Sequence, residues 1–321
     1  MTPSGTVAGE TTHVRTYYDR PVLKEPVWRW YIPAYFFSGG LAGASSMLAL
    51  GATLVGDRDL ARRARLAALG SVATGAGFLV ADLGRPSRFY NMLRVAKVTS
   101  PMSVGSWLLA GYGPAAALAA ASDLSGVAPG VGLAADAVAG VLGAGVSTYT
   151  GVLVADTAIP AWHEARHELP FLFASGAAAS AGAIGAALSS DHSALPARRL
   201  AVTAAIAELA LAEELSRRLG EVGKPYRQGS AGRLAKAEKA MTGVGVVLLG
   251  PLGRRRRPRV AGGALIAAGA LLGRFTVWQA GRQSAREPKH VIGPQRRAIE
   301  GRTRDGQASQ DGPPMTTGTT G

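Results

Sequence analysis

Long stretches of apolar and small residues, none of them charged, recur along the chain. Four contain 19 to 25 residues each: 33–56, 98–122, 137–155 and 169–190. A helix of roughly 20 residues crosses the hydrocarbon core of a bilayer, so each stretch predicts a membrane-spanning helix. Four further candidates are shorter or contain a charge: 66–81, 200–215, 240–253 and 260–279. The pattern therefore predicts about eight membrane-spanning helices.

A soluble helical protein rich in alanine and glycine is the alternative, because alanine favours helix without a membrane. A soluble helix needs a polar stripe that faces water. Residues 33–56 offer only Ser and Thr hydroxyls for such a stripe, which favours the membrane. We predict an all-α fold, a polytopic helical bundle in two four-helix halves over residues 33–281. A cytoplasmic segment, 1–32, would precede it, and a disordered basic tail, 282–321, would follow.

Lys and Arg are unevenly divided between the two sides of this predicted bundle. With an even number of spans, 23 of the 35 basic residues lie on the side of both termini and 11 on the other, with Arg274 inside the last span. Basic loops are retained in the cytoplasm, so both termini are predicted to be cytoplasmic, in the plasma (inner) membrane. The net charge of +14 is assigned to this topology and to anionic lipid rather than to nucleic acid.

The residues that hold metals and haem are scarce. The chain has no Cys, so it is predicted to contain no disulfide, iron–sulfur cluster or thiolate-bound metal. None of the five His residues lies in a predicted span, whereas a membrane cytochrome b needs axial ligands inside the bundle. His163 and His167 are four residues apart, but such a pair in a loop is weak support for a metal site. Any iron–sulfur chemistry is expected in a partner.

Polar and aromatic residues gather where the first four predicted spans begin or end. Because successive spans run in opposite directions, the starts of the first and third and the ends of the second and fourth share one face. These ends contribute Trp30, Tyr35, Asp82, Arg85, Tyr149 and Asp156. An aromatic cavity with a few polar groups suits a quinone headgroup, whose oxygens Tyr and Asp could hydrogen-bond. The simpler alternatives are a membrane-interface belt for the aromatics and an Asp82 that is solvated or paired with Arg85.

Two charged residues lie well inside predicted spans, Glu208 near the middle of the sixth and Arg274 in the eighth, whereas Glu213 and Glu214 stand at the end of the sixth span and are assigned to the interface. A lone ion within the membrane is costly, so such residues are usually paired or functional. The two interpretations are a mutually neutralising structural pair and a proton path.

Three sequence motifs resemble the NrfD and polysulfide-reductase membrane-subunit family, over about residues 28–280. They are Trp28-Arg29-Trp30 running into Gly40-Leu41-Ala42-Gly43, Asp82-Leu83-Gly84-Arg85-Pro86, and Lys97-Val98-Thr99-Ser100-Pro101-Met102-Ser103-Val104-Gly105-Ser106-Trp107. The resemblance implies a bundle without haem, iron–sulfur cluster or metal that exchanges electrons between quinone or quinol and a four-cluster ferredoxin-like iron–sulfur subunit. That subunit would serve a molybdopterin catalytic subunit. Early in the first helix, where the family often has His or Asn, this chain has Ile32 and Tyr35, of which Tyr35 can hydrogen-bond a quinone oxygen.

The expected function is that of the membrane quinone-interacting subunit of a multisubunit molybdopterin oxidoreductase. With the site on the cytoplasmic side, a formate dehydrogenase-like complex is favoured over a polysulfide or sulfur reductase-like one. A secondary transporter or ion-translocating protein is the alternative, based on Asp136, Glu208 and Arg274, although no inverted repeat supports it. A structural anchor that binds no quinone is a third interpretation.

Overall fold

The computed structural model describes residues 26–286, and these residues form helices and no strands. Eight helices have 20 residues or more: α1 (Tyr31–Leu54), α2 (Arg58–Leu83), α4 (Pro101–Ser125), α5 (Pro129–Ala155), α7 (Leu169–Leu188), α8 (Ala194–Arg218), α10 (Gly229–Leu249) and α11 (Arg256–Arg286). The short helices are α3 (Phe89–Met92), α6 (Pro160–His163) and α9 (Lys224–Arg227), with a 3₁₀ turn at Pro86–Arg88. The predicted all-α fold is confirmed.

Six of the long helices are long and apolar enough to cross a bilayer, namely α1, α2, α4, α5, α7 and α11. The other two, α8 and α10, carry more charge, although the 21 residues of α10 still measure about 31 Å at about 1.5 Å per residue. Large apolar side chains remain exposed along α4 and α5, among them Trp107, Leu118, Val141 and Val152. Such a surface suits lipid rather than water, and the chain is an integral membrane protein.

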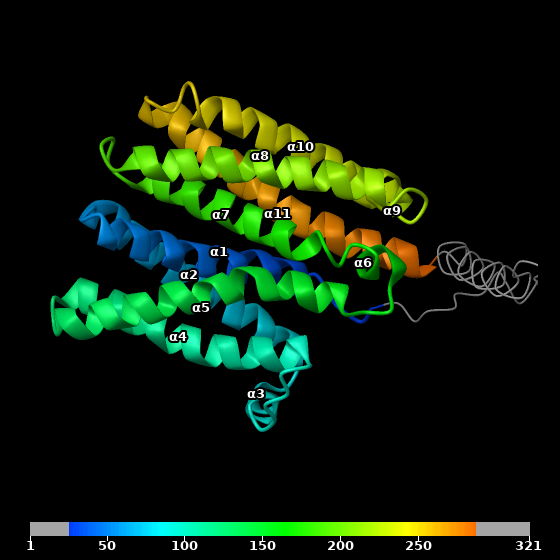
Figure 1. Ribbon diagram of the computed structural model, residues 1–321, viewed down its shortest axis with the longest axis horizontal. Coiled ribbons are helices and arrows are strands. Elements are labelled where there is room, and N and C mark those ends of the chain that lie inside the picture. Colours follow the sequence, from blue (N-terminus) through cyan, green and yellow to red (C-terminus); the bar gives the residue numbers. More distant parts are fainter. Residues whose placement is uncertain (1–25, 287–321) are drawn as a thin grey trace, which may run out of the picture.

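The long helices form two four-helix bundles that lie side by side (Figure 1). In the first bundle, α1, α2, α4 and α5 each pack against two neighbours in a ring, and in the second bundle α7, α8, α10 and α11 do the same. The bundles meet where α1 and α5 pack against α7, with α11 also contacting α1. The prediction of two four-helix halves is confirmed.

Close contact between α1 and α5 depends on two glycines that face each other. A Cβ atom added at Gly43 would lie 3.1 Å from the Ser147 backbone nitrogen and 3.2 Å from the Gly143 carbonyl carbon, and one added at Gly143 would meet Gly43 in the same way. Small residues four apart let membrane helices approach this closely. The glycines of the first helix therefore have a packing role at the centre of the molecule.

The eight long helices alternate in direction, so their ends define two faces. We call the termini face the one that holds the starts of α1, α4, α7 and α10, the ends of α2, α5, α8 and α11, and the short helices; it lies on the right in Figure 1. The opposite end of the bundles is the far face. At the termini face α4 begins as its sequence predicts, with Pro101 in the first turn and the Ser100 hydroxyl accepting a hydrogen bond from the Ser103 amide at 3.4 Å.

The seventh long helix differs most from its predicted bounds. The uncharged stretch 240–253 predicts this span, whereas α10 begins at Gly229 and includes the charged segment 233–239. Ala, Lys, Arg and Glu are strong helix formers, and long basic side chains can extend to the membrane surface, so these charges do not end the helix. At the other boundary α11 continues to Arg286, past the expected limit at 281. Most of the two predicted terminal segments, 1–25 and 287–321, lies outside the described residues.

Candidate functional site

Two buried tyrosines meet between α1 and α5 near the termini face. The Tyr35 and Tyr149 hydroxyls hydrogen-bond each other, and both side chains are buried. Gly105 on α4 makes room for the second ring, because a Cβ atom there would lie 2.7 Å from Tyr149 Cδ2. Gly105 belongs to the third sequence motif, which therefore shapes the space around Tyr149.

Tyr149 also lines a cavity of about 640 Å³ between α4 and α5. The walls are mostly apolar and include Val98, Val104, Leu108 and Val152, while the polar groups at its edge are Thr99, Asp156, His163 and Arg166. Ligand cavities in proteins commonly measure about 300–1,000 Å³ and combine apolar walls with a few polar groups. The α4–α5 cavity therefore has the size and lining for a small aromatic ligand.

Three of the predicted site residues lie on a neighbouring surface instead. Trp30 is 52% exposed and packs against the Tyr31 and Phe78 rings, with ring centroids 4.5 and 5.8 Å apart. Asp82 is exposed near the end of α2, where the positive charge of Arg29 attracts its carboxylate. Arg85, which is also exposed, follows that helix. None of Trp30, Asp82 and Arg85 lines the α4–α5 cavity. The structure thus places Tyr149 and Asp156 in the lining of one cavity, with Tyr35 bonded to Tyr149 behind it, and leaves the other three outside that lining.

A buried tryptophan on α6 joins the two bundles at the termini face. The Trp162 Nε1 group donates a hydrogen bond to the Val277 carbonyl at 2.7 Å, and its ring stacks on Trp28 at 5.2 Å. Trp278 Nε1 donates to the Trp28 carbonyl at 3.1 Å. The first tryptophan of the Trp28-Arg29-Trp30 motif therefore packs between bundles, and the second faces the surface.

Tyr226 on α9 supports the same α6 segment. Its hydroxyl donates a hydrogen bond to the Ala161 carbonyl at 3.1 Å. Burial, with the Glu168 charge as a smaller cause, raises the pKa of the Tyr226 phenol above its ordinary value. Arg218 pairs with Glu168 nearby, so charged and aromatic contacts both hold this part of the termini face in place.

The second bundle contains a buried cluster of Glu208 on α8, Glu238 on α10 and Arg274 on α11, which we call the Arg274 cluster. The three residues are 1%, 6% and 2% exposed. Arg274 Nη1 lies 3.8 Å from Glu208 Oε1, and Arg274 Nη2 donates to the Phe173 carbonyl at 2.6 Å. Both Glu208 oxygens, and the Nε and Nη1 atoms of Arg274, are buried without a hydrogen-bond partner. The predicted Glu208–Arg274 pair thus exists as a loose ion pair with unsatisfied groups.

Glycines on two helices leave room for these carboxylates. A Cβ atom at Gly176 on α7 would lie 2.8 Å from the Glu208 carboxyl carbon, and one at Gly273 on α11 would lie 2.8 Å from Glu238 Oε1. Neither glycine has a positive φ angle, so space rather than backbone conformation accounts for them. Helices α7 and α11 are therefore shaped around the buried acids.

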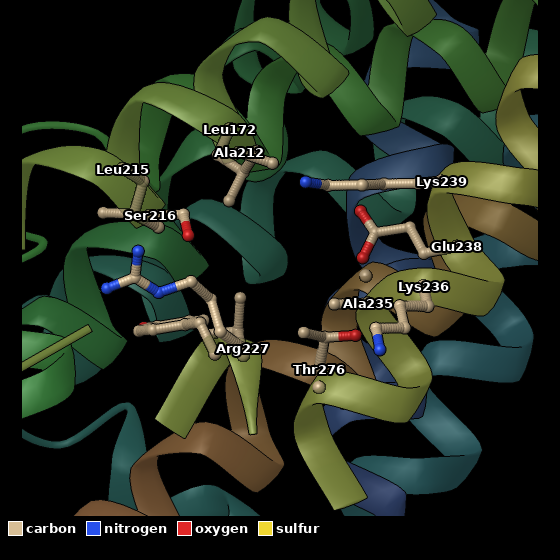
Figure 2. A pocket seen from close by; sticks show the side chains of 14 residues that line it. Leu172, Ala212, Leu215, Ser216, Arg227, Ala235, Lys236, Glu238, Lys239 and Thr276 are labelled. Carbon is tan, nitrogen blue, oxygen red and sulfur yellow. The ribbon is translucent and has the colours of Figure 1, made fainter. Parts of the chain in front are cut away.

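A cavity of about 290 Å³ reaches Glu238 from the termini face (Figure 2). Leu172, Ala212, Leu215 and Val277 provide apolar lining, and Arg227, Lys236 and Lys239 provide cationic groups. Figure 2 shows the Glu238 carboxylate on the opposite side of this cavity from Ser216 and Arg227. We call it the α8–α10 cavity.

Glu238 is the functional candidate that the sequence interpretation missed. It stands among Arg233, Lys236 and Lys239, so this segment resembles a solvated loop. The available signal was a helical stripe of buried positions in α10: Ala231, Glu238, Thr242, Gly245 and Leu249. A charge that shares a stripe with small and apolar residues is expected inside the bundle.

A second arginine cluster lies at the far face of the first bundle. Arg65 Nε and Nη2 donate to the two Asp136 carboxylate oxygens at 3.1 and 2.9 Å, and Nη1 donates to Asp123 at 2.9 Å. Thr53 accepts from Arg65 at 2.6 Å and donates to Asp136 at 2.9 Å. Asp136, a basis for the transporter alternative, is therefore fully paired in this Arg65 cluster.

Comparison with known proteins identifies one family whose model matches the chain. A family model described as polysulphide reductase, NrfD, matches residues 21–211 of the chain. The matched part contains the first bundle, α7 and most of α8, including Tyr35, Tyr149 and Glu208. Glu238 and Arg274 lie beyond it. No match was found among curated proteins.

Proposed function

The chain belongs to the polysulphide reductase NrfD family, and we propose on this premise that it is the subunit through which an oxidoreductase complex exchanges electrons with membrane quinone. Members of this family are membrane subunits of oxidoreductase complexes. The observation that carries the proposal is the buried Tyr149 hydroxyl, which belongs to a residue that lines the α4–α5 cavity and is hydrogen-bonded to Tyr35. That cavity is apolar enough for a quinone ring and has hydroxyl groups for its oxygens.

A quinone that takes up two electrons and two protons becomes a quinol, and the reverse reaction releases them. In the proposed site Tyr149 donates a hydrogen bond to a quinone oxygen, while Tyr35 orients the Tyr149 hydroxyl. Asp156 and His163 lie at the cavity edge, where carboxylate and imidazole groups can exchange protons with water. These residues position the headgroup and supply protons, and the electrons come from a partner.

The termini face is the proposed docking side for that partner. The exposed Trp30, Asp82 and Arg85 lie on this face, and the α4–α5 cavity is formed by the start of α4 and the end of α5 on the same face, so a subunit bound there would be on the quinone's side of the bundle. We propose a four-cluster ferredoxin-like iron–sulfur subunit at this face, followed by a molybdopterin catalytic subunit. If both termini are cytoplasmic, as the excess of Lys and Arg favours, a formate dehydrogenase-like complex fits better than a polysulfide reductase-like one.

An ion-translocating membrane protein is the second candidate function. The observation that favours it is the Arg274 cluster, whose charged groups are buried and incompletely paired. Intramembrane ionisable residues often mark ion pathways. The two functions are compatible, because the cavity of the proposed quinone site lies in the first bundle and this cluster in the second.

The experiment compares Tyr149→Phe and Tyr35→Phe with the matched control Tyr112→Phe. Tyr112 is also buried in the first bundle and hydrogen-bonded, to Ser46 at 2.9 Å, but it does not line the cavity. Binding of a quinone analogue to the purified chain, and quinone turnover by the complex isolated with its partners, are measured. Tyr149→Phe should weaken binding about tenfold, the effect of losing one hydrogen bond to the ligand, and Tyr35→Phe, which removes only the group that orients the Tyr149 hydroxyl, should weaken it less.

Unchanged binding and turnover in both Tyr149→Phe and Tyr35→Phe would contradict the quinone site. An equal loss in Tyr112→Phe would show that the measurement reports bundle stability rather than ligand contact. Isolation of the chain with partners but without quinone turnover would instead support a purely structural anchor.

A further inference from the structure

Charge balance sets the Arg274 cluster apart from an ordinary buried ion pair. Two carboxyl groups, Glu208 and Glu238, lie near one guanidinium, so ionisation of both would leave a net negative charge in the interior. Burial of an uncompensated charge is strongly unfavourable. A neutral cluster needs one additional positive charge.

Among the residues that the structure describes, no other cation is buried beside these acids, and Arg259, the other buried arginine of α11, pairs with Asp191. Helix α7, which packs against the cluster, contains no ionisable residue. Lys239 on α10 is half-exposed and its ammonium group binds Glu213 on α8 at 2.7 Å. Lys236, Tyr226 and Arg227 line the cavity farther toward the termini face. Among the described residues, Arg274 is thus the one cation buried with the two acids.

We propose that Glu208 and Glu238 share one exchangeable proton, which enters and leaves through the α8–α10 cavity. Glu208 is the more enclosed acid, and its two oxygens have no hydrogen-bond donor, which favours its neutral form. Glu238 lines the cavity and is the group that exchanges the proton with water from the termini face. The step is a simple transfer of a proton between carboxyl oxygen and water, and no oxidant or reductant takes part.

Infrared titration of the purified chain in lipid nanodiscs tests this inference, because a protonated carboxylic acid has a carbonyl stretch that a carboxylate lacks. The unmodified chain should show such a band at neutral pH and lose it at alkaline pH. In Glu208→Gln and in Glu238→Gln a single acid remains to balance Arg274, so each variant should lose the band. The control Glu214→Gln, at an exposed position on α8, should retain it.

Three outcomes would overturn the proposal. They are the absence of a titrating acid band in the unmodified chain, a band that persists in both single variants, and a band that sodium ions remove at constant pH. The last result would identify a monovalent-cation site instead. The infrared titration of the unmodified chain needs no variant, so it tests the proposal even if a substitution impairs folding. None of the measurements uses quinone or a partner, so failure here leaves the quinone site untouched.

The access route has its own matched pair of variants on one helix. Ala235 lines the α8–α10 cavity, whereas Ala237 is exposed on α10 and does not line it. After transfer to deuterated water, the acid band should shift more slowly in Ala235→Leu than in the unmodified chain. Ala237→Leu should leave the rate unchanged. Equal rates in both variants would place the proton route elsewhere.

Discussion

Each of the two bundles places an arginine beside two carboxylates, yet the two clusters differ in how they are paired. In the Arg65 cluster, four hydrogen bonds from one guanidinium go to Asp136, Asp123 and Thr53 at 2.6–3.1 Å. In the Arg274 cluster, Arg274 Nη1 lies 3.8 Å from Glu208 Oε1, and the guanidinium donates a hydrogen bond to a backbone carbonyl. Bidentate pairing at the far face satisfies the charges, whereas loose pairing in the second bundle leaves charged groups unsatisfied.

This difference separates a structural pair from a chemically active one. Asp123 is partly exposed and also lies 3.8 Å from Arg62, so the far-face cluster is neutral without a proton. Among the described residues, the other buried arginine of this bundle, Arg259, pairs with Asp191 instead, and the Arg274 cluster is reached by a cavity. Full pairing favours a fixed charge state, and incomplete pairing beside a cavity favours proton exchange.

Replacement of the arginine in each cluster should give the largest difference in the free energy of unfolding between the two clusters. Arg65→Gln leaves Asp136 buried without its partner and should lower the free energy of unfolding by about 3–5 kcal/mol. Arg274→Gln should cost less, because Glu208 and Glu238 can take up protons through the α8–α10 cavity. Unfolding in mixed detergent and dodecyl sulfate micelles measures both.

Arg63→Gln is the control for the arginine variants. Arg63 is on the same helix as Arg65 but exposed, with Asp59 at 3.4 Å, and its loss should change the free energy by less than about 1 kcal/mol. If Arg274→Gln proves as costly as Arg65→Gln, the Arg274 cluster is a structural pair and the contrast is lost.

Replacement of one acid in each cluster should give a smaller difference in the free energy of unfolding. Asp136→Asn replaces a charged acceptor of two Arg65 hydrogen bonds and should cost about 1–3 kcal/mol. Glu238→Gln leaves Glu208 to balance Arg274 and should change the free energy of unfolding by less than Asp136→Asn does. The same unfolding assay compares them at neutral pH, and a Glu238→Gln cost equal to that of Asp136→Asn would contradict a shared proton.

The membrane fold is largely predictable from the sequence because uncharged stretches report burial in lipid directly. The difference in pairing between the Arg65 and Arg274 clusters cannot be predicted from the sequence, because it depends on distances between helices that are far apart in the chain. Glu208 and Arg274 stand out in apolar stretches, but Glu238 is hidden among basic residues that continue α10. The alternation of spans likewise predicts which helix ends share a face, but side-chain packing decides that Tyr149 lines the cavity and Trp30 does not.

The smallest expected effect on stability concerns Tyr226, which lines the α8–α10 cavity. A cavity at the far face, lined in part by Arg65, has no tyrosine in its lining. Tyr226→Phe removes the hydrogen bond to Ala161 and should cost about 1 kcal/mol at neutral pH. Since burial raises the pKa of Tyr226, the folded chain holds this proton more tightly than the unfolded chain does. The contribution is fully present below about pH 10, the ordinary value, and is lost as pH rises further.

Tyr226→Phe should therefore lose less stability than the unmodified chain when the pH is raised above about 10. Tyr31→Phe, at the start of α1 and only partly buried, is the control, and it should leave the neutral-pH stability nearly unchanged. Parallel alkaline curves for Tyr226→Phe and the unmodified chain would show that the phenol is hydrated in the folded state. The cavity would then admit water along its whole wall, and access to Glu238 would not depend on the opening beside Ala235.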